Sequence, residues 1–140
     1  MNEDIKKRIM EKVEIVIERV EFIEGHLSNE ILGNRILRKA IYKEFQEAVE
    51  AVSDVCAMLR RGLNSSAKDD YSNIDFLVEH AILKEKKAEK LKEANGLRNR
   101  LIHGYDSVDD ETACYAIIEL IEDLRDFSVA VLEWKRENSS

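Results

Sequence analysis

Residues 40–55 read AIYKEFQEAVEAVSDV, and this stretch decides the fold. Its apolar side chains recur at steps of three and four residues, the spacing of one face of an α-helix. The pattern continues outward in both directions and predicts one long helix from about Glu30 to Arg61. Because the apolar stripe is widest between Ala40 and Val55, we expect this helix to lie at the centre of a bundle.

Four further segments are expected to be helices, and residues typical of helix ends mark some of their boundaries. Ser28-Asn29-Glu30 offers a cap for the start of the central helix, and a loop of small and polar residues follows it at 62–70. Gly104 stands where many helices end in a left-handed residue. The expected ranges are about Glu3–Glu24, Ser72–Val78, Ile82–His103 and Asp109–Arg136.

Composition supports the same fold class. The chain has 140 residues, no proline and only five glycines, so it has few turn formers and many helix formers. Its apolar fraction of 44% is too high for a disordered chain. We therefore predict an all-α protein, an up-and-down bundle of four long helices plus one short helix, forming a single domain over residues 1–140.

The sequence also bears on location. No apolar run approaches the ~20 residues that a membrane-spanning helix needs, and the charges that follow Met1 do not resemble a secretory signal. Cys56 and Cys114 lie in helical patterns without metal-ligand spacing, so we expect buried, reduced thiols. These features predict a cytoplasmic protein without membrane contacts.

Charge is unevenly distributed along the chain. The net charge of −7 argues against general nucleic-acid binding. Residues 79–105 nevertheless hold seven basic and four acidic side chains, whereas residues 109–126 hold seven acidic side chains and one basic. Two such helices often pair with each other, but they also permit a local basic groove. Lysines between 84 and 92 could guide RNA, although interleaved glutamates favour a solvated face.

The inventory of catalytic groups is small. There is no glycine-rich phosphate loop, nucleophile elbow or zinc-type cysteine cluster. Glu44, Glu47 and Glu50 lie along the central helix, but no histidine follows at the spacing of a di-metal bundle, so we interpret them as a solvated edge. His26 and His80 are interpreted as surface histidines. We predict neither a metal nor a cofactor.

The strongest chemical signal is Arg98-Asn99-Arg100-Leu101-Ile102-His103-Gly104-Tyr105. Four residues separate Arg98 from His103, Asn99 follows the arginine, and Tyr105 follows two residues after the histidine. This pattern resembles the signature of the HEPN superfamily, specifically the HepT-like ribonuclease toxins encoded beside a small nucleotidyltransferase (MNT) antitoxin. The helical plan and the position of the motif near the end of the penultimate long helix extend the resemblance.

The chemistry of these side chains fits RNA cleavage without a metal. Arg98 carries a planar cation that can hold a phosphate by two hydrogen bonds and stabilise the charge of a phosphorane. His103 can take a proton from a ribose 2′-hydroxyl or give one to the leaving oxygen. Asn99 lies one turn before His103, where its amide could orient the imidazole or contact the RNA backbone.

Helix geometry bears on whether one chain suffices. Arg98 and His103 are five residues apart, which places them about 140° apart around a regular helix. Convergence is easier if the helix ends at His103 or if a second copy supplies the partner group. The HEPN resemblance implies the second arrangement, a homodimer in which both motifs face a shared cleft.

The resemblance implies further properties. It implies the toxin of a type II/VII-like toxin–antitoxin system, a metal-independent ribonuclease that a nucleotidyltransferase antitoxin silences by adenylating (AMPylating) Tyr105. Phosphates attached at Tyr105 would occupy Arg98 and block the phosphate of the substrate.

Two alternatives stay open. The chain could be a non-catalytic helical module that binds and assists a nucleotidyltransferase partner. It could also be a structural dimerisation domain, in which Arg98 is buried in an intramolecular ion pair and the motif is a packing element.

Overall fold

The computed structural model describes residues 1–28, 30–104 and 108–138. These residues form five helices and no strand, which confirms the predicted all-α fold of four long helices and one short one. The helices are α1 (Glu3–His26), α2 (Arg35–Gly62), α3 (Asp70–Glu79), α4 (Glu85–His103) and α5 (Asp110–Glu137).

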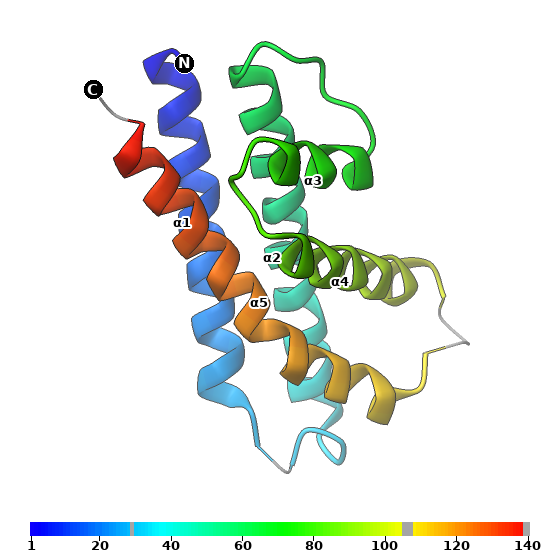
Figure 1. Ribbon diagram of the computed structural model, residues 1–140. Helices are drawn as coiled ribbons and strands as arrows, with labels where there is room; N and C mark the ends of the chain where they lie inside the picture. Colours follow the sequence, from blue (N-terminus) through cyan, green and yellow to red (C-terminus); the bar gives the residue numbers. More distant parts are fainter. Residues whose placement is uncertain (29, 105–107, 139–140) are drawn as a thin grey trace.

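The helix α2 occupies the centre of the bundle. It contacts each of the other four helices, whereas α1 contacts only α2 and α5. Figure 1 shows α1 and α2 side by side and antiparallel, α5 lying obliquely along them, and α3 and α4 running across the direction of α2. The central position predicted for residues 40–55 is confirmed.

Burial follows the apolar stripes. Within α2, the side chains of Phe45, Val55 and Leu59 are fully buried, and they belong to one cluster to which all five helices contribute. In α1, apolar side chains at steps of three and four residues are likewise buried. These residues are Ile9, Val13, Val16, Val20 and Ile23.

The start of α2 differs from the prediction. The helix begins at Arg35 rather than Glu30, because Asn34 provides the N-cap and its side chain accepts a hydrogen bond from the Leu37 amide at 3.0 Å. The residues before it form a turn instead, and Arg38 donates to the carbonyl of Leu32 at 2.7 Å across that turn. The hydroxyl of Ser28 accepts a local bond from the Glu30 amide at 3.2 Å.

The start of α4 also lies later than predicted, at Glu85 rather than Ile82. Ile82 and Leu83 are buried, but they lie in the turn that closes α3, where both amides donate to the carbonyl of Leu77 at 2.9 and 3.2 Å. Ala81 adopts the left-handed conformation in this turn, with φ 58°. The apolar residues of this buried turn therefore extended the helical spacing in the sequence, although the turn itself is not helical.

The predicted left-handed conformation of Gly104 is wrong, because its φ is −107°. The chain ends α4 with an ordinary bond from the Gly104 amide to the Arg100 carbonyl at 2.8 Å. Among the described residues the left-handed positions are Asn64, after α2, and Ala81, after α3.

Two other predictions concern the whole chain. Cys56 and Cys114 are both buried and free, as expected. None of the helices in the described part of the chain is long and apolar enough to cross a membrane.

Candidate active site

The last two turns of α4 carry three of the four predicted site residues. Leu91, Ala94 and Leu97 bury one side of the helix against the bundle. On other sides of the same turns, Asn99 and His103 are exposed and Arg98 is half-buried. Tyr105, the fourth predicted residue, lies outside the described residues.

Arg98 points toward α2. Its Nη1 donates to Asn99 Oδ1 at 3.2 Å, and its Nη2 lies 3.9 Å from a carboxylate oxygen of Glu50. The Nε atom is buried without an acceptor in the structure. Because Glu50 is 62% exposed and the separation is at the limit of an ion pair, this contact is weak, and Arg98 is not locked in a buried ion pair.

His103 occupies the C-terminal end of α4 and is exposed. Among the described contacts, no hydrogen bond joins His103 to Arg98 or to Asn99. One chain therefore supplies the arginine and the histidine on different sides of one helix, in agreement with their five-residue spacing.

Asn99 contacts the arginine of the motif. Its Oδ1 accepts from Arg98, so in this state its amide restrains the guanidinium. The predicted catalytic roles of Arg98 and His103 and the orienting role of Asn99 stay predictions.

Glu50 is a neighbour of the motif that the sequence did not predict. The prediction that the α2 glutamates form a solvated edge is wrong for Glu44. The side chain of Glu44 lies 3.2 Å from Arg19 Nε, and burial is the main cause that raises its pKa. Glu47 also approaches Arg19, at 3.7 Å. Glu50 differs from these two in the helix that it approaches, which is α4 rather than α1, and spacing along α2 carries no signal of that difference.

A polar cluster fixes the start of α5, the helix that follows the motif. Tyr42 donates to Asp110 Oδ1 at 2.6 Å, and Arg38 Nε lies 3.4 Å from the other carboxylate oxygen. Burial first, and then the bond to Asp110, raises the pKa of Tyr42 above its usual value. The cluster ties the start of α5 to α2, close in sequence to the end of the motif.

The other histidines have structural surroundings. The rings of His26 and His80 each stack on the phenylalanine four residues earlier, Phe22 and Phe76, and each Nδ1 lies within 3.0 Å of that residue's carbonyl oxygen. Both are exposed and end a helix, in agreement with their interpretation as surface histidines. No group of three or more metal-ligating side chains occurs in the described ranges.

The basic and acidic helices pair with each other in part. Lys87 of α4 binds Asp123 and Asp126 of α5 at 3.0 and 2.6 Å, and these contacts raise the pKa of Lys87. Lys92 binds Asp75 of α3 at 2.6 Å. The middle of α4 is thus not a uniformly free basic surface.

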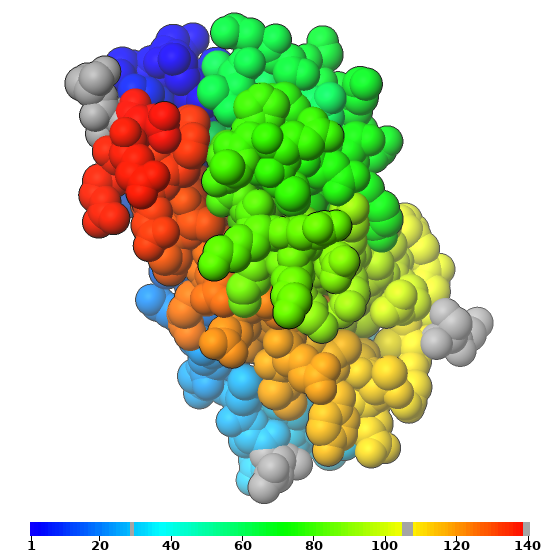
Figure 2. Space-filling view, in the orientation of Figure 1, coloured from blue at the N-terminus to red at the C-terminus, as the bar shows by residue number. Residues whose placement is uncertain are grey.

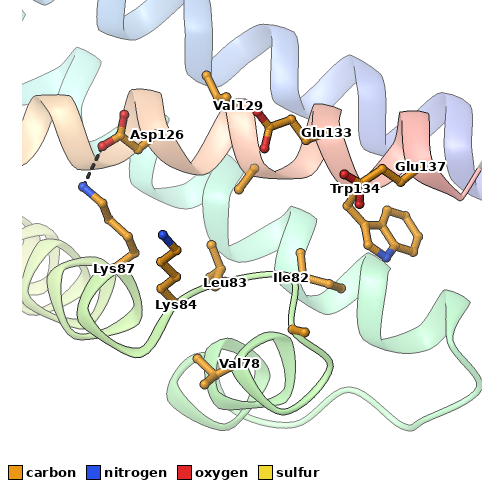
Figure 3. A pocket seen from close by; sticks show the side chains of 12 residues that line it. Val78, Ile82, Leu83, Lys84, Lys87, Asp126, Val129, Glu133, Trp134 and Glu137 are labelled. Carbon is orange, nitrogen blue, oxygen red and sulfur yellow. Dashed lines mark hydrogen bonds and ion pairs between the residues drawn. The ribbon is translucent and has the colours of Figure 1, made fainter.

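An open, largely apolar pocket lies away from the motif. It is lined by the α3–α4 turn and the C-terminal half of α5, and Figure 3 shows Ile82, Leu83 and Trp134 among the lining residues. No motif residue lines it. The candidate active site is instead the surface at the end of α4.

Comparisons with known proteins agree with this architecture. The model of the family described as "Ribonuclease HepT-like" matches residues 9–131. A relative from Archaeoglobus fulgidus, named as a candidate RNase, is 33% identical over 117 residues, which cover 84% of this chain and 86% of the relative.

Two solved structures share the fold. The Shewanella oneidensis HEPN toxin, tri-AMPylated and in complex with an MNT antitoxin, superposes with a TM-score of 0.77 at 19% identity, covering 95% of this chain and 99% of that chain. YutE from Bacillus subtilis, a cytosolic protein of unknown function, superposes with a TM-score of 0.84 at 16% identity, covering 96% and 94%. With the family match over most of its length, the chain belongs to the HepT-like ribonuclease family.

Proposed function

We propose that this protein is a metal-independent ribonuclease and the toxin of a toxin–antitoxin pair, and that it acts in the cytoplasm as a homodimer. The observation that carries the proposal is the arrangement at the end of α4. A half-buried arginine and an exposed histidine lie there, in a chain that belongs to a ribonuclease family. Because the pair with Glu50 is loose, the guanidinium is available for a substrate phosphate.

The reaction is an internal transfer within RNA. His103 takes the proton of a ribose 2′-hydroxyl, and the 2′-oxygen attacks the neighbouring phosphorus as the bond to the 5′-oxygen breaks. His103, protonated in that step, then gives the proton to the leaving 5′-oxygen. Arg98 stabilises the negative charge on the phosphorane, and Asn99 holds the guanidinium in place.

Two chains supply the groups that one chain separates. Arg38 and Tyr42 bind Asp110 and hold the starts of α2 and α5 together, beside exposed apolar side chains that a second copy would cover. These side chains are Leu32, Ile36, Tyr115 and Ile118, of which Ile36 is 85% exposed. A dimer across this end of the bundle would bring two α4 ends toward one cleft.

A nucleotidyltransferase antitoxin would silence the enzyme by adenylating Tyr105. The support is the sequence position, two residues after His103, and the AMPylated state of the Shewanella oneidensis toxin. Adenylate at this position would place phosphate near Arg98 and compete with RNA.

Two substitutions with matched controls test the proposal. Arg98→Ala and His103→Ala are expected to abolish RNA cleavage and growth arrest while leaving thermal unfolding unchanged. Arg8→Ala and His26→Ala remove an exposed arginine and an exposed histidine elsewhere, and should leave cleavage intact. Wild-type cleavage by either motif variant would contradict the proposal.

The intact mass of the protein co-expressed with its genomic neighbour tests the regulation. An adenylate increment mapped to Tyr105 is expected. Protein that is free of partner and adenylate yet cuts no RNA would favour the non-catalytic module instead.

A further inference from the structure

One face of α4 leads to His103. Lys92, Gly96, Arg100 and His103 follow at steps of four, four and three residues, so they share one side of the helix. Arg100 and His103 are both exposed on it. From Gly96 to His103 the helix rises about 10 Å.

An aromatic ring from α3 lies against the start of this face. Tyr71 is 44% exposed, and its hydroxyl donates to the carbonyl oxygen of Lys92 at 3.3 Å. The ammonium of Lys92 lies 6.0 Å from the centre of the ring. The hydrogen bond holds the ring in place, so a ligand that stacks on its exposed part loses little conformational freedom.

Gly96 forms the floor between this ring and Arg100. A Cβ atom built on Gly96 would lie 3.8 Å from the Tyr71 hydroxyl oxygen and 3.7 Å from Arg100 Nη1. A methyl group there would stand in ordinary van der Waals contact with both groups, so at Gly96 no side chain separates the Tyr71 hydroxyl from the Arg100 guanidinium. Figure 1 shows α3 beside α4, the two helices that provide these groups.

The charges on this face are unequal. Lys92 is neutralised by Asp75 at 2.6 Å. Arg100 has no ion pair and no side-chain hydrogen bond with any residue in the described part of the chain. It is therefore the cation that remains available to a phosphate next to Tyr71.

We propose that Tyr71, Gly96 and Arg100 form a subsite for single-stranded RNA, in which one unpaired base stacks on Tyr71 and Arg100 holds an adjacent phosphate. The subsite rests on the proposed function, because it takes RNA as the ligand of the chain. The 10 Å along α4 to His103 corresponds to about three stacked nucleotides. The base at Tyr71 therefore lies outside the scissile step and sets where along the strand cleavage falls.

A direct binding measurement tests the subsite. The probe is a 2′-O-methyl hexauridylate that carries one 2-aminopurine, whose fluorescence falls when it stacks; the blocked 2′-oxygen prevents cleavage. Wild type and Tyr71→Phe, which keeps the ring, are expected to quench the probe. Tyr71→Ala and Tyr71→Leu should lose the quenching and bind at least about fivefold more weakly, as for the loss of one stacked base.

Arg100→Ala tests the phosphate contact, and Arg8→Ala provides the matched control. Arg100→Ala should weaken binding and reduce the slope of log affinity against log salt by about one. Arg8 is exposed on α1, which contacts neither α3 nor α4, so its alanine variant should bind like wild type. Thermal unfolding of each variant separates loss of binding from loss of fold.

Several results would overturn the subsite. One is unchanged probe binding by Tyr71→Ala and Arg100→Ala; another is equal loss in Tyr71→Phe and Tyr71→Ala, which would assign the effect to the hydroxyl bond. Absence of probe binding by the wild type would also overturn it and would favour a protein contact at this face. Failure of the proposed function appears separately, as absence of cleavage of unmodified RNA by a protein that still binds the probe.

Discussion

Replacing Glu50 by glutamine removes the carboxylate that pairs with Arg98 in the described part of the chain, with little change in the size of the side chain. The two charges are 3.9 Å apart, which corresponds to about 1 kcal/mol in bulk water. Salt and the 62% exposure of Glu50 reduce this value. We therefore expect Glu50→Gln to lower the KM for RNA about two- to fivefold, because the phosphate no longer competes with a carboxylate for the guanidinium.

The assay is cleavage of a short fluorogenic RNA at two salt concentrations, and the effect should shrink at the higher one. Glu47→Gln is the matched control, since Glu47 lies on the same helix but approaches Arg19 instead. An unchanged KM with a lowered kcat in Glu50→Gln would refute the reasoning, because Glu50 would then act in the chemical step rather than compete with substrate.

Three other predictions follow from the site and its surroundings. Tyr42→Phe should lower the free energy of unfolding by about 1 kcal/mol, because it removes the bond to Asp110. Because folding raises the pKa of Tyr42, its contribution to the free energy of unfolding is present below about pH 10 and lost as the pH rises further. The free energies of unfolding measured in urea at pH 8 and pH 11 should therefore differ less for Tyr42→Phe than for wild type. The side-chain and backbone bonds from Thr112 lower the pKa of Asp109, so its contribution to stability is present above about pH 4 and lost as the pH falls. The melting temperatures at pH 5 and pH 3 should therefore differ less for Asp109→Asn than for wild type. An unchanged difference would argue against the cap. Cleavage should proceed at the same rate in EDTA as in magnesium, and loss of cleavage in EDTA would contradict a metal-independent mechanism.

Most of the fold could be predicted from apolar spacing, because each helix buries one stripe against a shared core. The errors lie at helix boundaries. Ile82 and Leu83 are buried by a turn rather than by a helix, and Asn34 outcompetes Ser28 as the cap of α2. Apolar spacing reports which side chains are buried but not whether the buried backbone is helical.

The candidate site divides in a similar way. The separation of Arg98 and His103 around α4 follows from their five-residue spacing, so the sequence predicts it. The approach of Glu50 to Arg98 and of Tyr71 to Gly96 depends on how α2 and α3 pack against α4. Such contacts join residues distant in the sequence, and no local pattern encodes them.

The most direct test of a shared active site is to mix the two inactive variants, Arg98→Ala and His103→Ala. If each site takes its arginine from one chain and its histidine from the other, a mixed dimer keeps one intact site of two. Random exchange makes half of the dimers mixed, so cleavage should return to about a quarter of the wild-type rate. A mixture that exchanges subunits and still cleaves no RNA would contradict the account.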